Sequence, residues 1–172
     1  ITLVEQIDSL TAIANEFSQF ATMPKAKREE IDLTVKVENI VAWFKESDSS
    51  AVSFEIVGDG PFQVFLDKEQ IRQVLTNLIT NALQSVPQGR TPEVIVRIER
   101  IDNSVRLSVQ DNGSGIHVDQ QEKLFQPNFT TKTSGMGLGL AISKNIINGS
   151  DGSIWFETND SGSIFYVELP LI

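Results

Sequence analysis

The chain has no cysteine and a single histidine, and each shortage excludes a class of site. Without cysteine there can be no disulfide framework, no thiolate metal site and no thiol nucleophile. One histidine, His117, rules out metal sites built from several imidazoles. The chain also has no G-x-x-x-x-G-K-[ST] sequence. If it binds phosphate, it must do so without a P-loop.

Positive charge is scarce as well. Lys and Arg total 14 against 23 Asp and Glu, which gives a net charge of −9. No basic stripe is present to neutralise nucleic-acid phosphates or to dock on an anionic membrane. No apolar run approaches membrane-spanning length, and the first residues are typical of neither a signal nor a transit peptide. We therefore expect a cytoplasmic protein with one domain of ordinary size and a short appendage.

The N-terminal residues differ in pattern from the rest. Residues 1–23 have apolar side chains at helical spacing, and Pro24 predicts the end of that helix. Residues 24–30 are charged and typical of a linker. A lone amphipathic helix cannot bury its apolar stripe, so residues 1–23 need a partner surface. We expect an appendage with its linker over residues 1–30 and one domain over residues 31–172.

Helical and strand patterns follow one another along the domain. Helices are expected with Thr34 as an N-cap, from Asp67 to about Ser85, and over Leu138–Ile147. Strand patterns occupy Val52–Val57 and Phe62–Leu66 around a G-D-G-P turn, Val94–Ile101 and Ser104–Gln110 around a tight turn, and Ser153–Glu157 with Ile164–Leu169. Residues 112–137 lack periodicity and are typical of a functional loop, with His117 as a surface residue. This order predicts an α+β fold, a two-layer sandwich with helices on one face of a mostly antiparallel sheet.

The helix that begins after Asp67 has a row of uncharged amides beside its apolar stripe. Its members are three or four residues apart: Gln70, Gln73, Asn77, Asn81 and Gln84. A solvated helix face is the simplest explanation, but such faces are usually rich in Lys and Glu. A half-buried polar wall is the alternative. In such a wall Asn81 could offer its amide oxygen to Mg²⁺, which prefers oxygen ligands.

Asp111 ends a predicted strand and is followed by N-G-S-G. D-N-G alone is typical of a hairpin turn, but the next segment has no obvious pairing strand. A strand-end carboxylate in a partly apolar pocket can accept a hydrogen bond from an exocyclic amine such as that of adenine. Gly113 and Gly115 would let the backbone approach a flat base closely.

Gly135, Gly137 and Gly139 lie directly before the third predicted helix. Glycine-rich backbone at a helix N-terminus offers N–H groups and the positive end of the helix dipole to an anion. A flexible linker is the alternative, and the regular apolar residues that follow disfavour it. Lys132 is the only cation of this loop and is the expected side-chain contact of a terminal phosphate.

In this order the motifs resemble those of the catalytic, ATP-binding domain of bacterial sensor histidine kinases. The resemblance covers about Leu33 to Leu169 and includes four boxes, at Gln73–Ala82, Asp111–Ile116, Phe125–Phe129 and Gly135–Leu140. The closing residues Gly162–Pro170 are also similar, with Ser163 where threonine is common. The resemblance implies a Bergerat-type sandwich with a mixed sheet. It also makes residues 1–23 similar to the second helix of the dimerisation and histidine-phosphotransfer domain.

The resemblance implies a site for ATP and Mg²⁺. Its catalytic residues would be Asn77, Asn81 and Lys132, with Asn81 as the metal ligand. The nucleotide-binding residues that it implies are Asp111, Gly113, Gly115, Ile116, Phe125, Thr130, Thr131, Gly135, Met136, Gly137, Leu138 and Gly139. The implied reaction transfers the ATP γ-phosphoryl group to a histidine on a phosphoacceptor helix that this sequence does not include.

Two alternatives share the same pocket. Relatives that hydrolyse ATP use a Glu one helical turn before the metal-binding Asn, and here that residue is Asn77. An amide cannot take a proton from water, which disfavours an ATP-hydrolysing domain. A pseudokinase that binds nucleotide only to dock a partner is disfavoured by the intact Asn81, Asp111 and second glycine box. One departure from the family is Gln84, where a cation that contacts phosphate is common.

The implied partners are the phosphoacceptor helix of the same kinase, a response-regulator receiver domain and a second copy in a full-length homodimer. Neither nucleic acid nor direct membrane contact is expected. The implied location is cytoplasmic, as part of a bacterial membrane-bound sensor.

Overall fold

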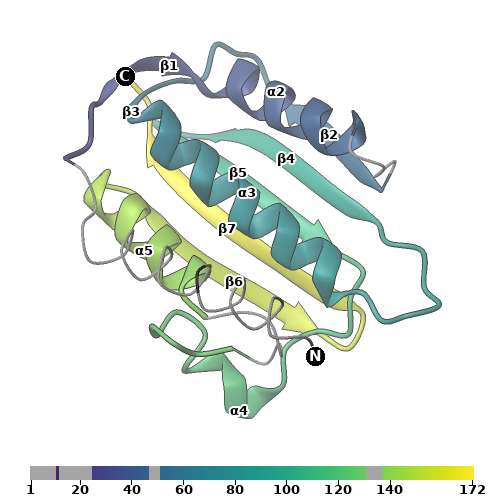
Figure 1. Ribbon diagram of the computed structural model, residues 1–172. Helices are drawn as coiled ribbons and strands as arrows, with labels where there is room; N and C mark the ends of the chain where they lie inside the picture. The colour runs from purple at the N-terminus through teal and green to yellow at the C-terminus, as the bar shows by residue number, and fades with distance from the viewer. Residues whose placement is uncertain (1–10, 12–24, 47–50, 131–136) are drawn as a thin grey trace.

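The fold is built on one five-stranded sheet that helices cover on one face (Figure 1). The structure is a computed structural model that describes Thr11 and residues 25–46, 51–130 and 137–172. In spatial order the strands are β2 (Val52–Val57), β4 (Val94–Ile101), β5 (Ser104–Asp111), β7 (Gly162–Pro170) and β6 (Ser153–Asn159). The covering helices are α2 (Leu33–Glu46), α3 (Lys68–Ser85) and α5 (Gly139–Gly149). The expected α+β sandwich is confirmed.

The sheet is mixed, because β2 and β4 are parallel whereas the other neighbours are antiparallel. A parallel pair needs a long crossover, and here the crossover contains β3 (Gln63–Leu66) and α3. β3 pairs instead with β1 (Glu29–Asp32) in a separate two-stranded sheet. The two strands expected around the G-D-G-P turn are thus present, but they belong to different sheets. The residues of a turn do not determine which distant strand forms hydrogen bonds with the strands on either side of it.

The core lies between the helices and the sheet. Alternate residues of each central strand face the helices, and on β4 these are the fully buried Val94, Val96 and Ile98. α3 contributes the largest share of the helical side, with six buried apolar residues: Ile71, Val74, Leu75, Leu78, Ile79 and Ala82. The predicted apolar stripe of this helix is thus the one that packs on the sheet.

The opposite face of the sheet has no helix over it in the described residues. Charged and aromatic side chains cover it instead. Trp155 stacks on Tyr166 with ring centroids 5.2 Å apart, and Arg106 lies 5.3 Å over the Trp155 ring. Arg106 also pairs with Glu168 at 2.8 Å. Burial, followed by the hydrogen bond and charge of Glu157, raises the pKa of Tyr166. Non-covalent side-chain contacts therefore join neighbouring strands on this face as well.

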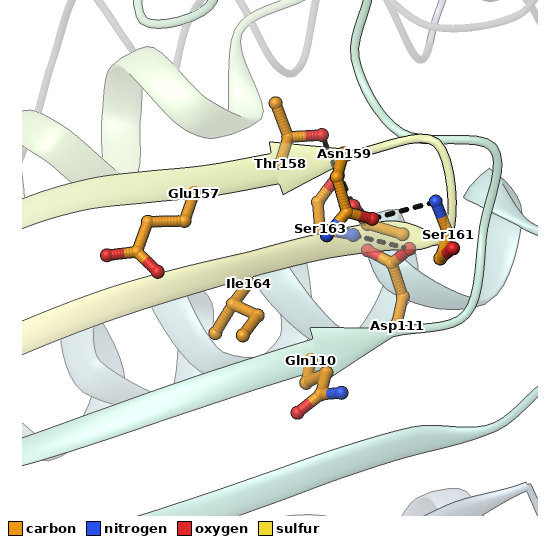
Figure 2. Close-up of a pocket in the computed structure, with 9 residues that line it drawn as sticks. Gln110, Asp111, Glu157, Thr158, Asn159, Ser161, Ser163 and Ile164 are labelled. Carbon is orange, nitrogen blue, oxygen red and sulfur yellow. Dashed lines mark hydrogen bonds between the residues drawn. The ribbon is translucent and has the colours of Figure 1, made fainter.

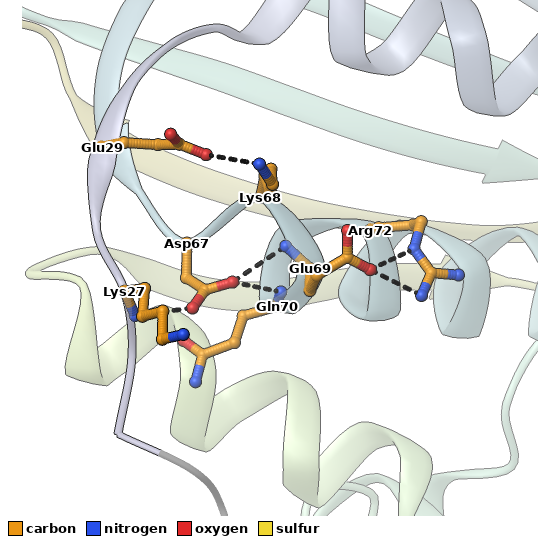
Figure 3. Close-up of polar contacts among 7 residues, drawn as sticks. All are labelled: Lys27, Glu29, Asp67, Lys68, Glu69, Gln70 and Arg72. Carbon is orange, nitrogen blue, oxygen red and sulfur yellow. Dashed lines mark hydrogen bonds and ion pairs between the residues drawn. The ribbon is translucent and has the colours of Figure 1, made fainter.

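Asp67 joins the residues before β1 to the start of α3 (Figure 3). One carboxylate oxygen accepts from the backbone N–H groups of Glu69 and Gln70, at 2.9 and 3.2 Å, as an N-cap does. The other oxygen accepts from the backbone N–H of Lys27 at 2.7 Å. Burial raises the pKa of Asp67, but these three backbone donors outweigh it, and the pKa lies below its ordinary value.

Other boundaries differ in detail from expectation. The cap of α2 is Asp32, whose carboxylate accepts from the backbone N–H of Thr34 at 2.9 Å, so Thr34 is not the cap. The loop after β5 contains a short helix, α4 (Val118–Gln121). β1 spans the expected domain boundary at residues 30 and 31. The expected helix of residues 1–23 lies outside the described residues, except for Thr11. Among the described helices none has both the length and the apolar character to cross a membrane.

Replacement of Asp67 by Ala should lower the free energy of unfolding by ~1 kcal/mol at neutral pH, because α3 loses its cap. Since the folded-state pKa is depressed, the carboxylate's contribution is fully present above its unfolded pKa of about 4 and is lost as pH falls through the folded value. Urea denaturation should therefore show the parent and Asp67→Ala converging as the pH is lowered from about 6 towards about 3.

The matched control is Asp67→Asn, which keeps an uncharged capping oxygen. Its stability relative to Asp67→Ala should not change with pH. A gap between the parent and Asp67→Ala that stays constant over this pH range would contradict the role of the ionised carboxylate.

Candidate functional site

Asp111 is the last residue of β5 and is 5% exposed. Its Oδ1 accepts from the backbone N–H of Gly113 at 2.8 Å and from that of Ser163 on β7 at 3.2 Å. Figure 2 shows the bond between Asp111 and Ser163 across the two strand ends. Two backbone donors thus fix one carboxylate oxygen within the described structure. Oδ2 remains as the oxygen that can accept from a bound amine.

The glycines after Asp111 are required by close packing of the chain on itself. A Cβ on Gly113 would lie 2.2 Å from the Ser85 hydroxyl at the end of α3. Gly115 has a φ of +73°, and its Cβ would lie 2.0 Å from the carbonyl oxygen of Asn159. Neither contact tolerates a side chain. These glycines therefore hold the loop against α3 and the β6–β7 turn, a reason that the sequence alone does not reveal.

The segment before α5 approaches the loop after α4 in the same way. Gly137 has a φ of +68°, and a Cβ there would lie 2.2 Å from the carbonyl oxygen of Phe129. Leu138 follows and is buried. As the N-cap residue of α5, Leu138 makes no side-chain hydrogen bond to the first N–H groups of the helix. A helix start without a side-chain cap is suited to an anion, which both the N–H groups and the helix dipole favour.

The amide row of α3 faces the start of α5. Asn77 Nδ2 donates to the carbonyl oxygen of Gly139 at 3.1 Å and lies 3.5 Å from the Ser143 hydroxyl. Asn81 is one helical turn further along the same face and is half-buried. Two amides therefore lie between the Asp111 end of the sheet and the glycine-rich start of α5, as a polar wall requires. The Asn77 amide, however, is hydrogen-bonded to the protein itself, through the Gly139 carbonyl.

The loop that bears the third box is anchored by aromatic packing. Phe125 lies 6.1 Å from Phe156 and 6.5 Å from Phe165, centroid to centroid, and Lys144 Nζ lies 5.4 Å over its ring. Phe125 is thus an anchor of the loop on β6 and β7. His117 is exposed and caps α4 by accepting from the backbone N–H of Asp119, as expected of a surface residue.

Ile116 links this loop to β6. Its backbone N–H donates to the Thr158 hydroxyl at 2.9 Å, and its carbonyl accepts from Gln121 at the same distance. Thr158 in turn lies 2.9 Å from the Ser163 hydroxyl. Ser163 therefore contacts both Asp111 and Thr158, the residue that holds the backbone of Ile116. Its only signal in the sequence is a departure from the family pattern.

Four of the expected site residues lie outside the described part of the chain: Thr131, Lys132, Gly135 and Met136. Thr130 is described and exposed. The others of the expected set come from α3, the end of β5, the loop through α4 and the start of α5. These segments are far apart in sequence, and Figure 1 shows them at one end of the fold.

A hollow of about 320 Å³ also lies at this end of the sheet (Figure 2). Gln110 and Glu157 line it and are register partners of Ile164, which places all three on the face without helices. Among the described residues, none of α3 or of the start of α5 lines it. The hollow therefore shares Asp111 with the candidate site but lies on the other side of the sheet.

Comparison with known proteins identifies the family. The family described as histidine kinase-, DNA gyrase B-, and HSP90-like ATPase matches residues 66–172. The chain therefore belongs to this family. Within it, the chain is a catalytic ATP-binding domain of the sensor histidine kinase type, as its relatives show.

Two sensor proteins match nearly the whole chain. The C4-dicarboxylate transport sensor protein DctB of Rhizobium meliloti (strain 1021) is 34% identical over 170 residues, which is 97% of this chain and 27% of DctB. The signal transduction histidine-protein kinase AtoS of Escherichia coli (strain K12) is 31% identical over 172 residues, 98% of this chain and 28% of AtoS. The chain thus spans little more than a quarter of either relative.

Solved structures show the same fold. The catalytic domain of the histidine kinase ThkA has a TM-score of 0.74 and 32% identity, covering 84% of this chain and 96% of the ThkA chain. ThkA in complex with the response regulator protein TrrA has a TM-score of 0.77 and 27% identity, covering 96% of this chain and 49% of that one.

Replacement of Asp111 by Asn should leave the fold intact, because the amide oxygen can still accept from Gly113 and Ser163. ATP affinity should fall by roughly 1.5–3 kcal/mol, about tenfold or more, since a charged acceptor for the adenine amine is lost. Calorimetric titration of the folded variant measures this. Asp160→Asn, which removes the same charge from the exposed β6–β7 turn, is the control and should bind as the parent does. Equal affinities for all three proteins would refute the adenine assignment.

Proposed function

We propose that this domain transfers the γ-phosphoryl group of ATP to a histidine imidazole on a phosphoacceptor helix. The observation that supports this most is the convergence of Asp111, the amides of α3 and the start of α5 at one end of the fold. A neutral imidazole is already a nucleophile. The domain therefore needs chiefly to position the phosphate and to neutralise its charge.

Each group has a role that its surroundings support. Asp111 would accept from the adenine amine, and the N–H groups from Gly137 to Gly139 would hold phosphates. Asn81 would be a ligand of Mg²⁺, and Lys132 with Thr131 would contact the terminal phosphates. In the described residues no group of three or more His, Cys, Asp or Glu could hold a metal ion. The metal would therefore need the nucleotide's own phosphates as ligands, as Mg²⁺ often does.

Asn77 argues against ATP hydrolysis as the main activity. An amide cannot take a proton from water. Its Nδ2 is also engaged with the Gly139 carbonyl at 3.1 Å, a contact that a Glu carboxylate could not make because both groups only accept. The residue at the position of the hydrolytic base is therefore part of a helix–helix contact here.

The proposal extends to the whole protein of which this chain is a part. We propose that residues 1–30 are the C-terminal helix of a dimerisation and histidine-phosphotransfer domain with its linker, and that residues 31–172 are the catalytic domain. The solved relative ThkA forms a complex with the response regulator protein TrrA. By analogy a receiver domain would accept the phosphoryl group next, and a homodimer would bring domain and phosphoacceptor together. Because the reaction consumes ATP, we place it in the cytoplasm.

A transfer assay tests this function. With radiolabelled ATP, Mg²⁺ and an added phosphoacceptor domain, the chain should place acid-labile phosphate on that domain and none on itself. Asn81→Ala should abolish both the transfer and the gain in nucleotide affinity that Mg²⁺ produces, because the amide ligand is lost.

His117→Ala is the matched control and should transfer at the parent rate, since His117 is an exposed cap of α4. Label that appears on this chain alone and disappears in His117→Ala would overturn the proposal. If Mg²⁺ raised nucleotide affinity equally in Asn81→Ala and the parent, Asn81 would be structural.

A further inference from the structure

The carbonyl oxygen of Gly139, in the first turn of α5, accepts from two side chains. Asn77 Nδ2 on α3 lies 3.1 Å from it, and the Ser143 hydroxyl one turn along α5 lies 2.9 Å from it. The two side chains are themselves 3.5 Å apart. One amide, one hydroxyl and one backbone carbonyl therefore form a closed polar cluster, which we call the Gly139 cluster.

The chemistry of this cluster sets the orientation of its members. A carbonyl oxygen only accepts, so Asn77 must turn its NH₂ group towards Gly139. Ser143 is fully buried at 0% exposed among the apolar residues of α5. A buried hydroxyl is stable only when it is hydrogen-bonded, and Gly139 satisfies it. The Ser143 hydroxyl of the cluster is thus buried, and Asn77 and Gly139 are half-buried beside it.

The position of the cluster connects the two halves of the site. The N-cap residue of α5, Leu138, has no side chain that could cap the first N–H groups of the helix. Asn77 is one helical turn from Asn81, and Gly139 follows Gly137 and Leu138 directly. The Gly139 cluster is therefore a polar link between the helix of the expected metal ligand and the backbone expected to hold phosphates.

We propose that Ser143 and Asn77 are positioning residues that hold the start of α5 in register with α3 for phosphate binding. This inference rests on the proposed function. Loss of the Ser143 hydroxyl leaves the Gly139 carbonyl with the Asn77 amide and the helical N–H of Ser143. It also removes the hydroxyl that lies 3.5 Å from the Asn77 amide, so the contact between α3 and the first turn of α5 loosens. Phosphate contacts through the α5 backbone should weaken, whereas adenine contacts through Asp111 should not.

The chain offers a matched control at the other end of α5. The Ser150 hydroxyl also donates to the carbonyl four residues earlier, that of Ile146, at 2.9 Å, and Ser150 is buried at 7% exposed. Ser150→Ala and Ser143→Ala therefore remove the same kind of bond from the same helix. They should lower the melting temperature to a similar degree. Only Ser143→Ala removes a bond at the proposed phosphate end.

The experiment compares the affinities of the parent, Ser143→Ala and Ser150→Ala for AMPPNP and for adenosine, with Mg²⁺ present. Ser143→Ala should lose about threefold to tenfold in AMPPNP affinity, the range that follows from one lost hydrogen bond, with adenosine affinity unchanged. Ser150→Ala should bind both ligands as the parent does. Equal AMPPNP affinity in the two variants would overturn the inference, and so would an equal loss for adenosine in Ser143→Ala.

A second variant tests the link to α3. Asn77→Asp places an acceptor against the Gly139 carbonyl and should lower AMPPNP affinity at least as much as Ser143→Ala. In the double variant the loss should be smaller than the sum of the two single losses, because both changes disrupt one cluster. Strictly additive losses would overturn the coupling. If the parent itself does not bind AMPPNP, the proposed function fails, and this outcome is distinct from a failure of the positioning role.

Discussion

The packing of α3 on the sheet is the contact on which the rest of the molecule depends. Leu75, Leu78 and Ile79 are fully buried in it, and each such side chain stabilises the fold by about 1.5–3 kcal/mol through burial. The same contact orients the amide face of α3 towards α5, because the two faces lie on one rigid helix. Displacement of α3 would therefore separate Asn77 from Gly139 and Ser85 from the glycine loop after β5. Stability and site geometry have a common origin here.

A two-layer fold leaves one face of its sheet without helices, and this protein stabilises that face by cross-strand contacts. Arg106 pairs with Glu168 and lies over Trp155, and Trp155 stacks on Tyr166. These contacts join β5, β7 and β6, the strands whose ends hold Asp111 and Ser163. Cross-strand pairs of this kind stabilise a sheet by a few tenths to about 1 kcal/mol each. The outer face thus helps to keep the strand ends together at the site.

Much of this arrangement can be predicted from local sequence. The apolar stripe and Asp67 cap of α3, the hairpin of β4 and β5 and the sandwich class are confirmed, because periodicity, capping and turn chemistry act over a few residues. The pairing of β3 with β1 is not predictable in this way, since the choice of a strand partner depends on residues far along the chain. The sequence favours Thr34 as the cap of α2, whereas the cap is Asp32, two residues earlier. Either side chain can accept a hydrogen bond from a backbone N–H at a helix start, so only the path of the backbone distinguishes them.

The candidate site shows the same division. Four spaced motifs are enough to indicate the family and a nucleotide pocket with Asp111 at a strand end. Each motif is a short stretch of chain whose own side chains or N–H groups can bind part of a ligand. The contacts between motifs depend on how α3, α5 and the strand ends pack together. Ser143 has no signal beyond a polar residue one turn after Gly139 in an apolar helix. The resemblance places Asn77 among the catalytic residues and does not indicate its contact with α5. Packing brings both side chains to one carbonyl, and sequence spacing contains no information about that distance.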